Sequence, residues 1–231
     1  MSDPKSPGPL IGSGRDCDVF DVGMGRVLRR SRTGGSSETE ALTMQHLHHL
    51  GYPVPEVFDA SGPDIVMERI NGFTMLDGFG KRPWKLATWA ALLADLTARL
   101  ATVPIPDHVL PLVGGRAEVI VHLDLHPLNV MLTDNGPVVI DWSNSAVGPR
   151  GLDSADTWLV IAAGQVDGSL IQRVTAAAAR RLFLRRYLAR FDLTPVRAML
   201  RTAFDNRSSD PNLRKVELDA MLSVVEAESS G

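Results

Sequence analysis

The sequence predicts an α+β fold, with a small antiparallel sheet plus one helix in its N-terminal part and a mainly helical C-terminal part. Before residue 70, short runs rich in β-branched residues alternate with turns that contain glycine. After residue 84, apolar residues recur at helical spacing in several long stretches. We therefore expect an N-terminal lobe over residues 10–70, a C-terminal lobe over residues 71–231, and a flexible lead-in over residues 1–9.

Size and composition restrict the class of protein. The chain has 231 residues, of which 44% are hydrophobic and 22% are charged, as is ordinary for a globular protein. The net charge of −3 argues against a general nucleic-acid binder. The sequence contains no run of about 18 apolar residues, so no membrane span is expected. A single cysteine, Cys17, excludes an internal disulfide and fits a reducing compartment, so we expect a cytoplasmic protein.

The first predicted elements are strands joined by glycine turns. Residues 10–20 contain Gly12 and Gly14, and a second turn at residues 23–25 leads into a strand at residues 26–29. A glycine-containing hairpin can bring backbone N–H groups close to phosphate oxygens, although paired glycines also occur in ordinary turns. The Walker pattern of P-loop proteins does not occur in the sequence.

One helix and two further strands complete the N-terminal part. A serine pair is a suitable N-cap for a helix over residues 37–50, and Glu40 lies in its first turn. Residues 57–60 and 65–68 form a predicted pair of antiparallel strands. The apolar face that we expect on the helix consists of Leu42, Met44, Leu47 and Leu50.

Helical periodicity predicts most of the C-terminal elements. The expected helix over residues 167–190 carries six arginines interleaved with apolar residues. This pattern is typical of a solvated basic helix with one buried face, and a patch for an acidic or nucleic-acid partner is the alternative. The expected helices cover residues 84–103, a stretch that residues 148–153 lead into and that runs through Ala163, and residues 167–190, 194–206 and 211–227.

Polar residues gather at two strand ends between residues 119 and 142. The runs at 119–121, 130–132 and 138–140 are β-rich, and an Asp-Asn-Gly turn joins the last two. The polar residues at these strand ends are His122, Asp124, Asn129 and Asp141.

The spacing His122-x-Asp124-x-x-x-x-Asn129 is that of the kinase catalytic loop, and Asp141 stands where the metal-binding Asp of the D-F-G motif would be. A carboxylate such as Asp124 can orient a hydroxyl and take its proton. Magnesium prefers hard oxygen ligands, such as those of Asn129 and Asp141. Each residue alone is also a common turn former near a strand end, but four of them at these intervals predict a site.

The segment resembles the aminoglycoside phosphotransferase and choline kinase family of kinase-like enzymes. That family's loop typically reads H-G-D-L-H-P-x-N and is followed by I-D-W or I-D-F. The present sequence reads HLDLHPLN from His122 and IDW from Ile140, with Leu123 in place of the usual glycine. The resemblance extends over most of residues 10–160. It implies a two-lobed, protein-kinase-like fold with ATP and Mg²⁺ as cofactors, in which Asn129 and Asp141 bind the metal.

The resemblance also implies roles outside the loop. Arg29 would contact the nucleotide phosphates in place of the usual lysine, and Glu40 would hold it there, with Glu38 as the competing candidate. From the residues alone, Arg29 could equally belong to a basic cluster on the surface. Glu40 could equally be an acidic residue that interacts with the dipole at the N-terminus of its helix. Asp153 matches an aspartate whose expected role is to cap a helix and to bind the catalytic loop. The other nucleotide-binding residues that the resemblance implies are Gly12, Gly14, Glu68 and Ile70.

The predicted reaction is transfer of the γ-phosphoryl group of ATP to a hydroxyl of a small molecule, with Asp124 as the catalytic residue. Family analogy leaves the acceptor open among aminoglycoside-like, choline-like and sugar-like compounds. A nucleotide-binding pseudokinase with a regulatory role is the alternative, because Arg29 replaces lysine and the glycine loop is reduced. A nucleic-acid-associated protein is a second alternative, based on the arginine-rich helix.

Overall fold

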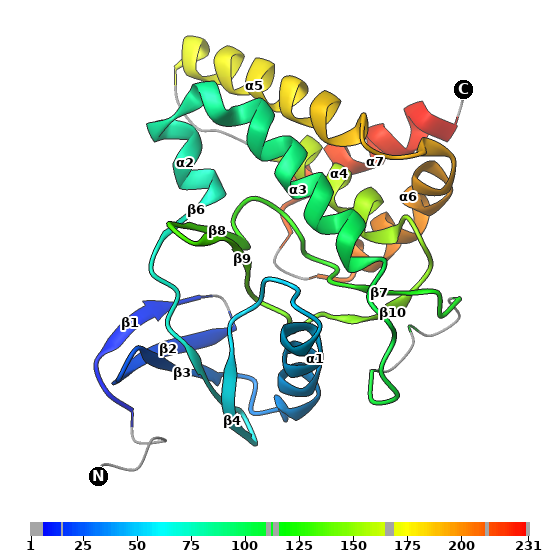
Figure 1. Cartoon of the computed structure of the whole chain (residues 1–231). Coiled ribbons are helices and arrows are strands. Elements are labelled where there is room, and N and C mark those ends of the chain that lie inside the picture. The colour runs from blue at the N-terminus through cyan, green and yellow to red at the C-terminus, as the bar shows by residue number, and fades with distance from the viewer. Residues whose placement is uncertain are drawn as a thin grey trace.

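The N-terminal part of the chain is an antiparallel sheet with one helix packed against it (Figure 1). The computed structural model describes residues 7–14, 16–109, 112, 116–164, 169–210 and 213–229. Five strands form this sheet in the order β1-β2-β3-β5-β4. Their bounds are β1 Leu10–Ser13, β2 Cys17–Gly23, β3 Arg26–Ser31, β4 Val57–Ser61 and β5 Asp64–Glu68. The strands predicted in this part of the sequence are therefore confirmed.

The helix of this part, α1 (Glu38–His49), buries a different face from the one predicted. Met44 and Leu47 lie in the core, as expected, together with Ala41. Leu42 and Leu50 are 45% and 44% exposed, so the prediction was wrong for these two leucines. An α-helix turns about 100° per residue, which places Leu42 about 200° away from Met44 on the helix surface.

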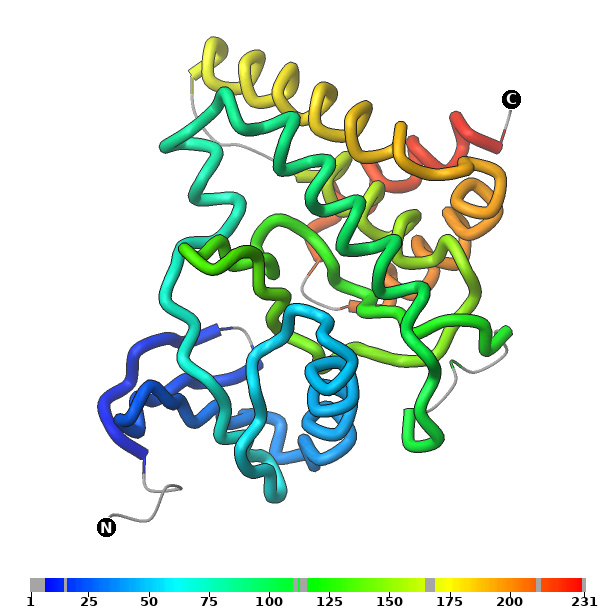
Figure 2. Tube along the Cα trace, viewed as in Figure 1, coloured from blue at the N-terminus to red at the C-terminus, as the bar shows by residue number. Residues whose placement is uncertain are grey.

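Helices form most of the C-terminal part, and two small sheets lie on the side of these helices that faces the N-terminal part (Figures 1 and 2). One sheet has the order β6-β8-β9, with β6 Phe73–Thr74, β8 Val130–Thr133 and β9 Gly136–Val139. The other pairs β7 Val119–Val121 with β10 Ala146–Gly148. The helices are α2 Met75–Lys81, α3 Leu86–Leu100, α4 Leu152–Ala163, α5 Leu170–Leu188, α6 Leu193–Ser208 and α7 Lys215–Ser229. This arrangement confirms the predicted α+β architecture.

Three short elements, β6, α2 and β10, were not predicted, and several boundaries differ. The α2 helix begins with a capping box between Thr74 and Asp77, a signal that was present in the sequence. Trp84, predicted as helical, lies in a 3-10 turn before α3. Residues 1–6 of the expected lead-in and residues 211–212 of the last expected helix lie outside the described residues. Within the described ranges, no helix is both long and apolar enough to cross a membrane.

A shared apolar core connects the N-terminal sheet to the helical part. Met44 and Leu47 of α1 belong to the same buried cluster as Leu93 of α3 and Trp142, which follows β9. A second cluster joins β7 to α4, α6 and α7, and includes Leu159. The strands that flank the loop after β7 therefore contact both halves of the molecule, and the loop between them is held from both sides.

Candidate active site

The loop between β7 and β8 begins with a turn that one buried carboxylate holds in place. Leu123 has a φ of +62°, a conformation that favours glycine. The backbone N–H of His122 donates to both oxygens of Asp153 at 3.0 and 2.8 Å, and the N–H of Leu123 donates to Oδ1 at 2.8 Å. The expected bond from Asp153 to the loop is therefore present. The expected cap is not, because the N-cap of α4 is Gly151 and has no side-chain bond.

Asp124 and Asn129 lie together inside this loop. The side-chain Nδ2 of Asn129 donates to the backbone oxygen and to Oδ2 of Asp124, both at 2.9 Å. Because both partners are acceptors, the amide nitrogen must face Asp124, and the amide oxygen Oδ1 points elsewhere. The backbone N–H of Ile140 donates to the backbone oxygen of Asn129 at 3.0 Å, which brings the end of β9 beside the loop.

Asp141 follows β9 and projects toward the N-terminal sheet. Its φ of +64° turns the chain sharply, and the fully buried Trp142, whose Nε1 donates to the oxygen of Val139 at 3.0 Å, anchors that turn. The Asp141 side chain remains 43% exposed. Arg29 Nη2 donates to its Oδ1 at 3.1 Å, so a residue of β3 contacts the end of β9.

Arg29 is a buried cation held by two carboxylates. Its Nη1 is 2.7 Å from Glu40 Oε2, whereas the competing candidate Glu38 is exposed to solvent. Burial alone would lower the pKa of Arg29, but the charges of Glu40 and Asp141 outweigh that effect and raise it. Arg29 is therefore permanently charged, and α1 fixes its position through Glu40.

The remaining predicted nucleotide-binding residues lie outside this connected group. Gly14 is in the β1-β2 hairpin, where its backbone N–H donates to Cys17 at 2.9 Å, and Gly12 is within β1. Glu68 is exposed at the end of β5, and Ile70 lies in the connection to β6. Their roles remain predictions, because the geometry of these residues does not by itself identify a ligand.

Sequence reasoning missed the cation that binds Asp124. Arg207 of α6 places Nη2 at 2.6 Å from Asp124 Oδ1, and it also binds Asp156 of α4. His126 Nε2 is 3.2 Å from the same Asp124 oxygen. The motif contained His126, but nothing near Arg207 in the sequence indicated that α6 would bring it to the loop.

The environment sets the protonation of the loop residues. Burial would raise the pKa of Asp124, but hydrogen bonding and charge interactions with His126 and Arg207 outweigh it and hold that pKa well below its ordinary value. Burial lowers the pKa of His122 to about 4, so its imidazole is neutral near pH 7. Asp124 is thus an ionised carboxylate within a largely buried loop, as a general base must be.

The donor atoms around Asp141 suit one particular class of metal. The described residues contain no cluster of three or more His, Cys, Asp or Glu side chains that could enclose an ion. What remains is one half-exposed carboxylate, Asp141, and the amide oxygen of Asn129. A set of one or two protein oxygens fits Mg²⁺ bound together with phosphate groups, rather than a metal enclosed by protein ligands alone.

Comparison with known proteins gave one family and several structures. A family model described as "Phosphotransferase enzyme family" matches residues 76–199. An aminoglycoside phosphotransferase, solved as a thermostable mutant in a ternary complex with AMP-PNP and hygromycin B, has a TM-score of 0.62 at 16% identity, covering 98% of this chain and 95% of that chain. A choline/ethanolamine kinase family protein from Mesorhizobium loti has a TM-score of 0.56 at 15% identity, covering 100% of this chain and 90% of that chain.

A third structure, amicoumacin kinase in complex with AMP-PNP, Ca²⁺ and its ligand, has a TM-score of 0.56 at 13% identity, covering 98% of this chain and 89% of that chain. At such identities the structures establish the kinase-like fold alone. A comparison with functionally curated proteins gave no match.

Proposed function

The chain belongs to the phosphotransferase enzyme family, whose members are small-molecule kinases, and on that premise we propose that it transfers the γ-phosphoryl group of ATP to a hydroxyl of a small molecule. One observation carries the proposal. A chain of contacts runs from Glu40 through Arg29 to Asp141, and the backbone bond of the preceding residue leads on to Asn129 and Asp124. Phosphate-binding, metal-binding and proton-accepting groups therefore adjoin one another.

The chemistry of transfer asks for alignment and charge rather than for a covalent intermediate. Asp124 accepts the proton of the acceptor hydroxyl. The hydroxyl oxygen forms a bond to the γ-phosphorus, the bond between that phosphorus and the β,γ-bridging oxygen breaks, and ADP leaves. The low pKa of Asp124 keeps the carboxylate ready to orient the hydroxyl before the phosphoryl group moves.

The nucleotide-binding groups come from both parts of the fold. Arg29, fixed by Glu40, binds phosphate oxygens with its planar guanidinium. Asn129 and Asp141 would hold Mg²⁺, which when bound neutralises phosphate charge. The other groups that we propose for the nucleotide are the hairpin backbone at Gly12 and Gly14, beside the phosphates, and the backbone between Glu68 and Ile70, beside the adenine.

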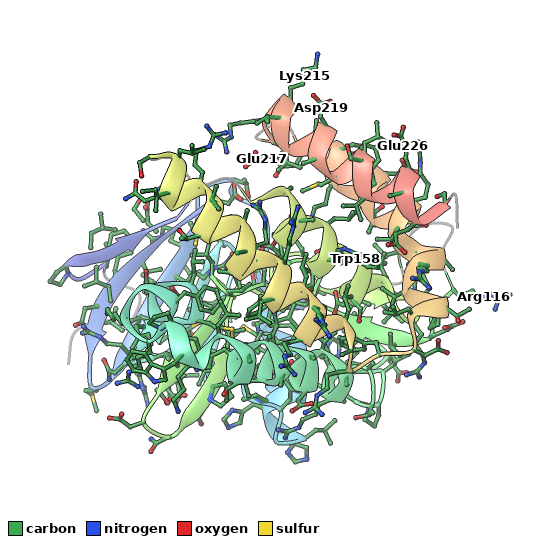
Figure 3. The ribbon with its side chains drawn as sticks, turned by 90° about the horizontal axis from the view of Figure 1, so that it is seen from above. Arg116, Trp158, Lys215, Glu217, Asp219 and Glu226 are labelled. Atoms are coloured by element: carbon green, nitrogen blue, oxygen red, sulfur yellow. The ribbon has the colours of Figure 1, made fainter. Side chains whose placement is uncertain are left out.

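The acceptor class is an aminoglycoside-like, choline-like or sugar-like alcohol. The acidic last helix would favour a cationic acceptor only if its carboxylates faced the site. Asp219 and Glu226 are exposed, and Figure 3 shows them along the outer side of α7. Asp219 and Glu226 therefore give no reason to prefer a cationic acceptor, and a screen of alcohols monitored by ADP release is needed to identify the acceptor class.

Asp124→Asn tests the proposal. Turnover of MgATP with the acceptor found in the screen should fall by about 100-fold or more, because a positioned general base contributes about that much. Nucleotide binding, measured by thermal shift, should persist. Asp134→Asn, in the exposed turn between β8 and β9, is the matched control and should behave as wild type.

Unchanged turnover in Asp124→Asn would remove Asp124 from its proposed role. A wild-type protein that binds MgATP but phosphorylates none of the screened alcohols would favour the pseudokinase instead.

A further inference from the structure

Arg207, near the end of α6, lies between two carboxylates. Its Nη2 is 2.6 Å from Asp124 Oδ1 and 2.7 Å from Asp156 Oδ2, and its Nε is 2.6 Å from Asp156 Oδ1. The same Nη2 lies 3.2 Å from the carbonyl oxygen of Leu123. The guanidinium is largely buried, so solvent screens these ion pairs little. One arginine thus connects α6 and α4 to the residue that we propose as the base.

The hydrogen bonds at Asp124 leave one of its oxygens open. A carboxylate oxygen accepts about two hydrogen bonds. Oδ1 receives Arg207 Nη2 at 2.6 Å and His126 Nε2 at 3.2 Å, which fill it. Oδ2 receives Asn129 Nδ2 at 2.9 Å, and no other donor to it is found in the described part of the chain. Oδ2 is therefore the oxygen that can accept a proton from a substrate hydroxyl.

Charged and titratable groups from several elements surround this carboxylate. Arg207 differs from the histidines and the carboxylate among them because a guanidinium stays charged at every accessible pH. The attraction between Arg207 and Asp124 is therefore not lost by deprotonation of the arginine. The groups that interact with Asp124 are His122 and His126 of the loop, Asp156 of α4, and Arg207 itself.

We propose that Arg207 is a positioning residue for phosphoryl transfer, which holds the Asp124 carboxylate turned so that Oδ2 faces the acceptor. The inference rests on the proposed function, in which Asp124 is the base. Asp156 holds the guanidinium in place, because its two oxygens bind Nε and Nη2 in the fork geometry that arginine offers and lysine does not. A base displaced by about 1 Å would slow the chemical step by about 100-fold.

Arg207→Gln should lower kcat about 10- to 100-fold and leave the KM for MgATP unchanged, because the Arg29 end of the site is untouched. Arg207→Lys should restore part of kcat, because the charge returns without the fork. Arg201→Gln, on the same helix and 66% exposed beside Asp205, is the control and should match wild type.

Arg207→Gln leaves Asp156 as a buried carboxylate without its cation, which can itself destabilise the fold. The double variant Arg207→Gln/Asp156→Asn removes that buried charge and keeps the change at Asp124. A low kcat with an unchanged KM for MgATP, in a double variant with the wild-type Tm, supports the proposal. A wild-type or higher kcat, or a kcat that falls only together with Tm, overturns it.

A measurement that needs no turnover separates this proposal from the proposed function. Crystal structures of wild type and the double variant show whether the Asp124 carboxylate keeps its orientation. A carboxylate that turns so that Oδ2 no longer accepts from Asn129 Nδ2 supports the positioning role of Arg207, even if wild type phosphorylates no alcohol in the screen. An unchanged orientation overturns that role, even if wild type proves to be an active kinase.

Discussion

Asp153→Asn should lower the free energy of unfolding, by an amount that depends on pH. Asp153 accepts three hydrogen bonds from the backbone N–H groups of His122 and Leu123. Asparagine offers a single oxygen, and its NH₂ group would face an N–H donor. A buried donor left without an acceptor costs about 1 to 3 kcal/mol, and the strained turn at Leu123 loses its anchor.

The pH dependence follows from the carboxyl group. Burial is the main cause that raises the pKa of Asp153 from its ordinary 3.8 to about 7, against the lowering effect of the bonds from His122 and Leu123. Between these values the folded state binds a proton that the unfolded chain has released. This contribution to stability is complete below about pH 4 and is lost as the pH rises through 7. From pH 5 to pH 8 the loss is about 2 to 3 kcal/mol.

Urea unfolding at pH 5, 6, 7 and 8 measures the effect. The stability difference between wild type and Asp153→Asn should shrink by about 2 to 3 kcal/mol across this range, because asparagine does not titrate. Thr157→Val is the matched control. It removes a neutral hydroxyl of α4 that donates to the backbone oxygen of Leu125 in the loop at 2.7 Å. The stability difference between wild type and Thr157→Val should therefore be the same at every pH. A constant difference for Asp153→Asn would refute the assignment of a raised pKa to this buried carboxyl.

Two further predictions concern backbone geometry and the nucleotide site. Gly151→Ala should lower Tm and reduce the free energy of unfolding by about 1 to 3 kcal/mol. The reason is that Gly151 has a φ of +90° and an added Cβ would lie 2.8 Å from the backbone of Pro195. Gly80→Ala, where a Cβ meets nothing within 4 Å, is its control, and equal Tm values for the two would contradict the reasoning. Cys17, the only cysteine in the sequence, lies within hydrogen-bonding reach of Arg29, and burial raises its pKa. MgATP should therefore slow maleimide labelling of Cys17 several-fold by mass spectrometry, whereas an unaffected rate would argue against phosphates beside Arg29.

Local patterns predicted much of the fold. The β-branched runs and their glycine turns have the strand pairings that the sequence indicated, because short hairpins depend mainly on nearby residues. The spacing of Asp124 and Asn129 within one short loop also allowed their contact, since few residues separate them. Spacing alone was not sufficient for Leu42. This apolar residue was predicted on the buried face of α1 but lies on an exposed face.

By itself, the sequence indicated which groups gather at the loop: carboxylates at Asp124 and Asp141 and an amide at Asn129, each placed by short-range spacing. Only the tertiary structure showed that Arg29 reaches Asp141, 112 residues away, and that Arg207 reaches Asp124, 83 residues away. The physical reason is that hydrogen bonding and dihedral preferences act over a few residues. Which distant side chain completes a buried ion pair depends instead on how helices and sheets pack around a common core.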